Sequence, residues 1–298
     1  MNSAVLPASL HAAIEEKLGM RVLDATAQSG GMINQTAQLQ TPDGTLFVKW
    51  NNNAPPQFFA KEARGLEALR ATKTLRVPEV ITVSDEAAVP FLVLEWIEPK
   101  IVWDKAAFAR SFAHGLAALH RTVALDGQYG WSEDNYLGAL PQQNSPRGSW
   151  PEFYRDCRLM PQIEMARGKG LLPADREALL MQIIEKTPVL LGGFSSRPSL
   201  LHGDLWSGNY LVGDGEAVLI DPAVHYGERE VEIAFIELFG GFPSGFLTAY
   251  NEAFPLEDGY ESRRQLHQLY PLLVHLNLFG ETYSADVERT CRAILRNG

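Results

Sequence analysis

One short block constrains this 298-residue chain more than any other feature. It reads Leu201-His-Gly-Asp-Leu-Trp-Ser-Gly-Asn209, and Ile220-Asp-Pro-Ala223 follows it. Between them, the turn Gly213-Asp-Gly215 and the strand pattern Ala217–Ile220 predict a tight hairpin. The hairpin should return the chain to its starting point, so the sequence predicts two aspartates and one asparagine in one neighbourhood.

Asp204, Asn209 and Asp221 are the groups that transfer of a γ-phosphoryl group to a hydroxyl requires. That reaction needs cations that neutralise charge, an acceptor held in line and a carboxylate that receives a proton. Carboxylate and amide oxygens are hard ligands that suit Mg²⁺. Any one of these residues alone is explained as well by a turn or a helix cap, but their combined spacing argues against that interpretation.

The composition limits which kinds of partner the chain is expected to bind. The net charge of −10 and the pI of about 5.2 argue against a nucleic acid bound through phosphate neutralisation. A nucleotide is compatible, because one lysine, backbone amides and bound cations can neutralise its phosphates locally. The two cysteines, Cys157 and Cys291, lack CxxC spacing, so neither a disulfide framework nor a structural zinc site is expected.

Residues 1–10 have no basic stretch followed by an apolar run, and no stretch approaches 18 consecutive apolar residues. We therefore expect no secretory signal and no membrane partner, with the cytoplasm as the compartment.

Apolar spacing and turn residues predict a β-rich first third. The turn Thr41-Pro-Asp-Gly44 separates two predicted strands, Ala37–Gln40 and Thr45–Trp50. A helix over Phe58–Leu69 and a buried strand over Phe91–Ile97 follow.

From Lys105 the pattern becomes mainly helical, with an irregular excursion at Asp126–Ser149 and further helices over Trp150–Met165 and Ala174–Lys186. The sequence predicts an α+β fold with domains at residues 1–96 and 97–298.

The chemistry-bearing block resembles the kinase-like superfamily, and within it the fructosamine/ketosamine kinase family, a relative of aminoglycoside and choline kinases. The resemblance covers residues 10–290. It rests on motifs in a fixed order, namely Phe47-Val-Lys49, Phe59-Ala-Lys-Glu-Ala-Arg-Gly-Leu66, Trp150-Pro-Glu-Phe-Tyr154, the block ending at Asn209, Asp221-Pro-Ala223 and Tyr226-Gly-Glu-Arg-Glu-Val-Glu-Ile-Ala234. It implies a two-lobed protein-kinase-like fold. The lobe at 1–96 would carry the phosphate loop, strand lysine and ion-pair helix, and the lobe at 97–298 the catalytic loop and acceptor site.

The resemblance also implies roles for single residues. Asp204 would be the catalytic base, and Asn209 and Asp221 would hold Mg²⁺. Lys49 would meet the α and β phosphates of ATP, with Glu62 as its ion-pair partner. Glu67 is a competing partner, and Lys61 could pair locally with either acid.

Two further segments follow from the same resemblance, and a third assignment, Trp206, follows from the tendency of aromatic faces to stack on sugar rings. Gly30 and Gly31 lie in a segment like the family's phosphate-covering loop, where Met32 stands in place of a cysteine that many members carry. The backbone of Glu95, Trp96 and Ile97 would bind adenine at a hinge. Trp206 would line the acceptor pocket, with a core tryptophan as the alternative.

By resemblance, the chain would use ATP and Mg²⁺ to phosphorylate the sugar C3 hydroxyl of ketosamines, either small molecules or glycated proteins. The phosphorylated adduct then breaks down, which implies deglycation. One alternative is a kinase for an aminoglycoside, choline, homoserine or methylthioribose. The other alternative is a catalytically silent nucleotide-binding or scaffold protein. Such a protein would be expected to lack one of the four residues Lys49, Asp204, Asn209 and Asp221, but all four are present. The preferred ketosamine and the oligomeric state stay open.

We predict structural rather than catalytic roles for the polar residues around this block. We predict that His120 satisfies a core hydrogen bond, and that Arg229 and Glu230 brace the loop through buried ion pairs. His225 stands near Asp221 without partners in sequence, which is poor support for a metal site.

Overall fold

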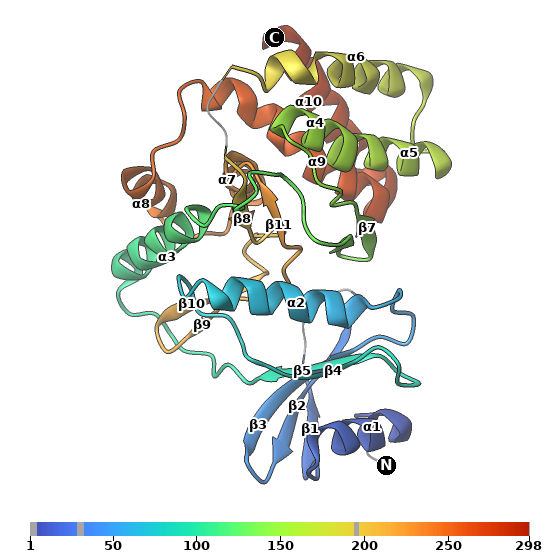
Figure 1. Cartoon of the computed structure of the whole chain (residues 1–298), viewed down its shortest axis with the longest axis vertical. Coiled ribbons are helices and arrows are strands. Elements are labelled where there is room, and N and C mark those ends of the chain that lie inside the picture. The colour runs from blue at the N-terminus through green and yellow to red at the C-terminus, as the bar shows by residue number, and fades with distance from the viewer. Residues whose placement is uncertain (1–4, 29–32, 194–196, 298) are drawn as a thin grey trace. The chain divides into compact units, whose positions relative to one another are not determined.

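The computed structural model describes residues 5–28, 33–193 and 197–297 (Figure 1). The chain divides into two compact units. The first comprises Met1–Trp103 with Tyr210–Pro222, and the second comprises Asp104–Asn209 with Ala223–Gly298. The first unit is β-rich and the second mainly helical, as the predicted α+β class requires.

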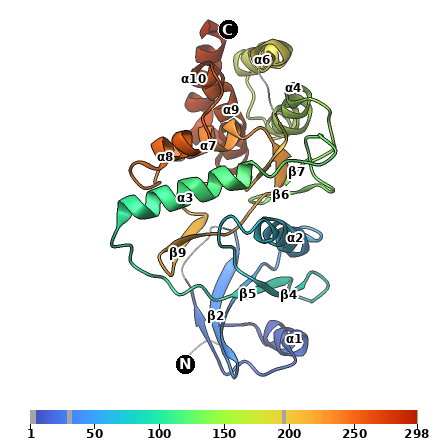
Figure 2. The same ribbon diagram turned by 60° about the vertical axis from the view of Figure 1, so that its left-hand side comes forward.

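The first unit is built on a five-stranded antiparallel sheet with the order β1-β2-β3-β5-β4. Helices α1 and α2 cover opposite faces of this sheet, as Figures 1 and 2 show. The elements are α1 (Ala8–Leu18), β1 (Asp24–Ala27), β2 (Gln35–Thr41), β3 (Gly44–Trp50), α2 (Phe58–Ala71), β4 (Val80–Ser84), β5 (Phe91–Glu95), β9 (Tyr210–Gly213) and β10 (Glu216–Leu219).

The predicted hairpin, helix and strand of the first third are present. Thr41 and Gly44 close the turn between β2 and β3, where the Thr41 hydroxyl donates a 2.8 Å hydrogen bond to the Gly44 carbonyl. The predicted strand over Phe91–Ile97 ends two residues early, since pairing with β3 stops at Glu95.

Alternation along β3 decides where Lys49 points. Val48 and Trp50 are buried in the cluster that α1 covers. Successive strand residues face opposite sides of a sheet, so Lys49 points to the side of α2.

The β9–β10 hairpin belongs to the first unit, so the division differs from the predicted boundary between residues 96 and 97. A parallel bridge joins Arg76 to Val218, and an antiparallel bridge joins Pro99 to Gly213. Lys100 also donates its backbone N–H to Val212 at 3.0 Å. These backbone bonds attach both the segment after β5 and the hairpin to the first unit. Sequence position does not reveal such long-range pairing.

The second unit is mainly helical, and two short strand pairs complete it. Its elements are α3 (Lys105–His120), β6 (Asn135–Leu137), β7 (Leu140–Gln142), α4 (Trp150–Phe153), the π-helix η1 (Tyr154–Leu159), α5 (Met160–Gly168), α6 (Ala174–Leu190), β8 (Ser199–Leu201), β11 (His225–Gly227), α7 (Glu230–Phe239), α8 (Phe246–Ala253), α9 (Tyr260–Phe279), the 3₁₀-helix η2 (Gly280–Tyr283) and α10 (Ser284–Asn297).

A large apolar cluster forms the core of this unit, with Trp150, Tyr154 and Leu273 among its fully buried members. Strands β8 and β11 pair beside it and set Leu201 opposite His225. This pairing joins the start of the block 201–209, called the catalytic block below, to the chain that follows Asp221-Pro-Ala223.

Candidate active site

Lys49 lies between two carboxylates of the first unit and is only 3% exposed. It forms ion pairs with Glu62 of α2 and with Asp221, whose Oδ1 lies 2.5 Å from the Lys49 Nζ. Of the two acids considered as partners, the structure selects Glu62, since Glu67 is exposed on α2. Three residues far apart in sequence thus meet at one buried cation.

The electrostatics keep this lysine charged. Burial disfavours the ammonium, but the charges and hydrogen bonds of Asp221 and Glu62 outweigh it, so the pKa of Lys49 lies above its ordinary value. Burial raises the pKa of Glu62 to about 7, against the opposing effect of the Lys49 charge.

Asp221 adopts a backbone conformation that is rare for a residue with a side chain. Its φ is +55°, in the left-handed region, and it follows β10 after one residue. Its side chain is 48% exposed although one oxygen contacts Lys49. The first unit therefore presents a carboxylate that is anchored by a cation and still open to a ligand.

The catalytic block of the second unit is held by its backbone. Glu232 of α7 accepts hydrogen bonds from the Gly203 N–H at 2.7 Å and the His202 N–H at 3.3 Å. Asp204 donates its own N–H to the His202 ring at 3.3 Å. Consecutive peptide groups are thereby fixed just before the predicted base.

Gly203 has no room for a side chain. Its φ is +85°, and a Cβ at this position would lie 2.1 Å from the carbonyl oxygen of Ala223. Ala223 in turn donates its N–H to the His202 carbonyl at 2.9 Å. Only glycine allows the two segments to approach this closely.

Glu232 belongs to a buried polar chain that the sequence analysis did not identify. His120 bonds to Glu232 at 3.0 Å through Nε2 and to the Tyr250 hydroxyl at 2.7 Å through Nδ1. Burial would raise the pKa of Glu232, but the hydrogen bond and charge of His120 hold it below its usual value. The predicted core role of His120 is confirmed, and its partner is the acid that fixes the catalytic block.

Asn209 orients the predicted base. Its Nδ2 donates to the Asp204 carbonyl at 2.7 Å and to the Asp204 carboxylate at 2.9 Å. Asn209 is buried, and these bonds fix which end of its amide faces Asp204. Its oxygen is consequently the atom left to act as a metal ligand.

Trp206 is 41% exposed, so the alternative of a core tryptophan is wrong. Its ring lies over Gly208, where a Cβ would come within 2.3 Å of the indole. The catalytic block thus presents an aromatic face between Asp204 and Asn209.

The structure says less about the residues predicted to bind adenine and to cover the phosphates. Glu95 ends β5 and accepts a 2.7 Å hydrogen bond from Arg76. Trp96 donates to Glu98 at 2.9 Å, and Ile97 is buried. Gly30 and Gly31 lie outside the described residues.

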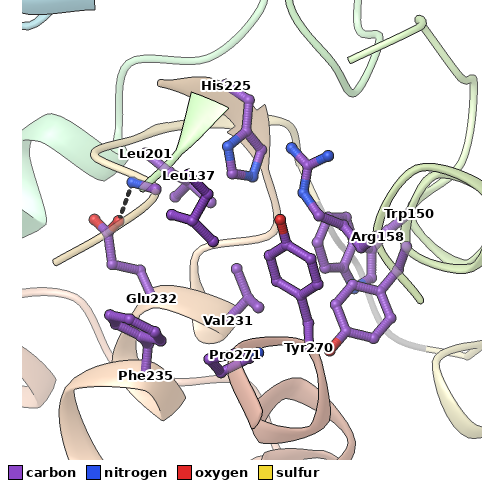
Figure 3. Close-up of a pocket in the computed structure, with 12 residues that line it drawn as sticks. Leu137, Trp150, Arg158, Leu201, His225, Val231, Glu232, Phe235, Tyr270 and Pro271 are labelled. Carbon is purple, nitrogen blue, oxygen red and sulfur yellow. Dashed lines mark hydrogen bonds between the residues drawn. The ribbon is translucent and has the colours of Figure 1, made fainter. Parts of the chain in front are cut away.

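A small cavity in the second unit is not the acceptor site. Figure 3 shows Arg158, His225 and Tyr270 on one side of it and Glu232 on the other. Its volume is about 20 Å³. Small-molecule pockets usually need roughly 300 Å³ or more.

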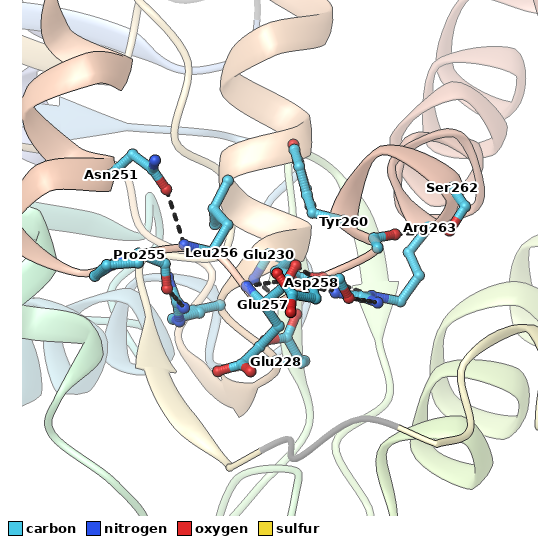
Figure 4. Close-up of polar contacts among 12 residues, drawn as sticks. Glu228, Glu230, Asn251, Pro255, Leu256, Glu257, Asp258, Tyr260, Ser262 and Arg263 are labelled. Atoms are coloured by element: carbon cyan, nitrogen blue, oxygen red, sulfur yellow. Dashed lines mark hydrogen bonds and ion pairs between the residues drawn. The ribbon is translucent and has the colours of Figure 1, made fainter.

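The brace that we predicted after Asp221 is present in altered form. Glu230 and Arg263 form a buried ion pair at 2.8 Å (Figure 4), which confirms the interpretation for Glu230. Arg229 instead donates to the Tyr250 hydroxyl at 3.2 Å and to the backbone carbonyls of Phe254 and Pro255. Arg229 is therefore held by carbonyl oxygens, whereas we predicted that it forms an ion pair with a carboxylate.

The surroundings of His225 are those of a buried residue of the fold. It is buried, its Nδ1 lies 3.1 Å from the Ala223 carbonyl, and burial lowers its pKa.

Among the residues described, no helix combines the length and apolar character needed to cross a bilayer.

Comparison with known proteins decides the family. The fructosamine kinase family model matches residues 8–297. The chain belongs to the fructosamine kinase family. A probable ketoamine kinase of Synechocystis sp. is 39% identical over 284 residues, which cover 93% of this chain and 92% of the relative. The chloroplastic protein-ribulosamine 3-kinase of Oryza sativa subsp. indica is 36% identical over 276 residues, which cover 92% of this chain and 79% of the relative.

Solved structures agree with this family and its fold. A candidate fructosamine-3-kinase from Thermobifida fusca superposes with a TM-score of 0.86 at 36% identity and covers 97% of this chain and 99% of its own. The aminoglycoside phosphotransferase APH(4)-Ia has a TM-score of 0.65 at 16% identity, covering 97% of this chain and 98% of its own. The latter likeness concerns the fold alone. The predicted family resemblance and the kinase-like α+β fold are both confirmed.

Proposed function

We propose that this fructosamine-kinase-family protein transfers the γ-phosphoryl group of ATP to the sugar C3 hydroxyl of a ketosamine. The names of its relatives, a ketoamine kinase and a protein-ribulosamine 3-kinase, support this acceptor class. Breakdown of the phosphorylated adduct would free the amine, so the protein would act in deglycation. The acceptor would be a small ketosamine or a glycated protein.

The observation that carries the kinase chemistry is the buried Lys49 between Glu62 and Asp221. A lysine stem is flexible and must be fixed before it can position a phosphate. Glu62 supplies that fixation from α2. Lys49 would then bind the α and β phosphates as a charge that burial has not removed.

The donor set fits Mg²⁺. Asp221 offers a partly exposed carboxylate, and Asn209 offers an amide oxygen whose nitrogen is engaged by Asp204. When bound, the ion supplies neutralisation of charge on the phosphates. These two residues would hold it.

Asp204 would act as the base. As the acceptor oxygen forms its bond to the γ-phosphorus, the bond from that phosphorus to the β–γ bridging oxygen breaks and ADP leaves. The hydroxyl proton moves to the Asp204 carboxylate, which Asn209 holds by a 2.9 Å hydrogen bond. Trp206 would contact the sugar through its exposed ring face.

Further assignments complete the proposal. The backbone of Glu95, Trp96 and Ile97 would bind adenine, and Gly30 and Gly31 would cover the phosphates. Residues 1–96 would serve mainly nucleotide binding, and residues 97–298 would carry the catalytic loop and acceptor site. A cytoplasmic location stays a prediction.

The test is coupled ADP release from Mg·ATP with a panel of acceptors, with Asp204→Asn as the control. The panel contains ribulose-lysine, fructose-lysine, choline, homoserine, methylthioribose and kanamycin. Turnover confined to the ketosamines and lost in the control supports the proposal. Turnover on another acceptor alone would refute the ketosamine assignment and leave the kinase chemistry in place, and no turnover on any acceptor would refute the kinase.

A further inference from the structure

A surface groove of about 450 Å³ lies in the second unit, where α7 ends and α8 begins. This volume is within the range of small-molecule sites. The groove is formed by the end of α7, a glycine-rich loop and the first turn of α8, and its lining residues are Ile236, Glu237 and 240–248.

The groove adjoins the catalytic block through Gly241. A Cβ on Gly241 would lie 2.4 Å from the Ser207 Oγ and 2.5 Å from the Ser207 Cβ, and its φ is +80°. Glycine therefore allows the loop backbone to rest directly on Ser207. Ser207 stands between Trp206 and Asn209 in the sequence, so the groove borders the block that we propose receives the acceptor sugar.

The lining has two chemical parts. One is apolar, with Phe242, Pro243 and the 37%-exposed Leu247. The other is a single carboxylate, Glu237, to which the Tyr260 hydroxyl donates a hydrogen bond. Arg264 lies 3.8 Å from Glu237 and pairs more closely with Glu261, at 2.8 Å, so it neutralises Glu237 only weakly.

We propose that this groove binds the part of the ketosamine that lies beyond the sugar: Glu237 receives the protonated secondary amine, and the apolar lining receives the aliphatic chain of a lysine. This inference rests on the proposed function. In a ketosamine the amine is attached at C1, two carbons from the C3 hydroxyl. With that hydroxyl at Asp204, the amine and its chain must leave the sugar close to the catalytic block. A carboxylate attracts the ammonium, and the methylenes of lysine bury against apolar side chains.

The first experiment separates the charge from the chain. Steady-state kinetics use three fructose derivatives: the adduct of Nα-acetyl-lysine, the adduct of methylamine, and a thioether that replaces the methylamine nitrogen by sulfur. For Glu237→Gln we expect KM to rise about tenfold for both amines and by less than about twofold for the thioether. Glu252→Gln, an exposed acid on α8 outside the groove, is the matched control and should match the wild type.

The second variant addresses the chain. Leu247→Ser should raise KM about threefold to tenfold for the lysine adduct and leave the methylamine adduct unchanged. Equal effects of Glu237→Gln on amine and thioether, or of Leu247→Ser on long and short adducts, would overturn the inference. Failure of the wild type to turn over these amine adducts and also ribulose-lysine would instead refute the proposed function.

A third comparison tests the junction with the catalytic block. Gly241→Ala should lower kcat about tenfold because its methyl group must displace Ser207. Gly280→Ala introduces a similar backbone strain, at a φ of +70°, with nothing within 4 Å of the new Cβ. If the two variants lower kcat equally, the groove is not coupled to the catalytic block and the inference fails.

Discussion

The two units hold Asp221 and Asp204 in different ways. Asp221 in the first unit is anchored by the side-chain charge of Lys49 and is 48% exposed. Asp204 in the second unit follows peptide groups that are hydrogen-bonded to the fully buried Glu232. A side-chain ion pair can exchange partners when a phosphate or cation arrives, whereas backbone bonds to a buried acid keep one geometry. Under the proposed function, this difference would let the first unit adapt to a nucleotide while the second keeps Asp204 in place.

The sharpest way to break this comparison is Asp204→Asn. We expect kcat to fall about 100-fold to 10,000-fold, because the amide cannot receive the acceptor proton. Mg·ATP affinity should change by less than about twofold, since Lys49, which we propose binds the phosphates, belongs to the first unit. Coupled ADP release and equilibrium nucleotide binding check the two parts. A near-normal kcat would show that Asp204 is not the base.

Asp221→Ala should produce the opposite pattern. Removal of the carboxylate should weaken Mg²⁺-dependent ATP binding about 10-fold to 100-fold, because a metal ligand and an anchor of Lys49 are both lost. ATP binding measured without the metal should change far less. Unchanged binding in Mg²⁺ titrations would contradict the assignment of Asp221 as a ligand.

Glu232→Gln tests whether the second unit really depends on a buried anchor. The amide leaves His120 and two peptide N–H groups poorly paired, so we expect a loss of about 3 kcal/mol in the free energy of unfolding. Among molecules that remain folded, kcat should fall about tenfold while the Mg·ATP dissociation constant stays unchanged. Urea denaturation and single-turnover kinetics measure these effects. A fall in ATP affinity as large as the fall in kcat would show that the anchor is not specific to the catalytic block.

The smallest expected effect concerns Glu228, which precedes α7 in the same unit. Burial and the charge of Glu230 raise its pKa to about 8. The folded protein therefore binds more protons than the unfolded chain between about pH 4.5 and pH 8, so this group's contribution to stability falls as pH rises through that window. Glu228→Gln should remove that part of the slope, so the variant should gain stability relative to the wild type at pH 8.5 compared with pH 5. Urea denaturation at both pH values measures this effect, with the exposed Glu252→Gln as control. If Glu228 were ionised throughout, Glu228→Gln and the wild type would show the same dependence of the free energy of unfolding on pH.

The sequence by itself determined the elements and the chemical types at the site. The turn Thr41-Pro-Asp-Gly44 and the helix beginning at Phe58 follow from local turn chemistry and apolar spacing, and both are present. The ordered motifs from Phe47-Val-Lys49 to Tyr226-Gly-Glu-Arg-Glu-Val-Glu-Ile-Ala234 were sufficient to predict the family, which comparison confirmed. These features are local or lie within one short block, so a single sequence contains the information needed to find them.

The tertiary structure alone decided which partners these residues have. It selected Glu62 for Lys49, exposed Trp206, attached the β9–β10 hairpin to the first unit and brought Gly241 onto Ser207. Glu232 gave only a weak signal, an acid within the apolar run of α7, because its partners His120 and Gly203 are 112 and 29 residues away. Such contacts depend on how helices and loops pack after they form, and no local pattern specifies them.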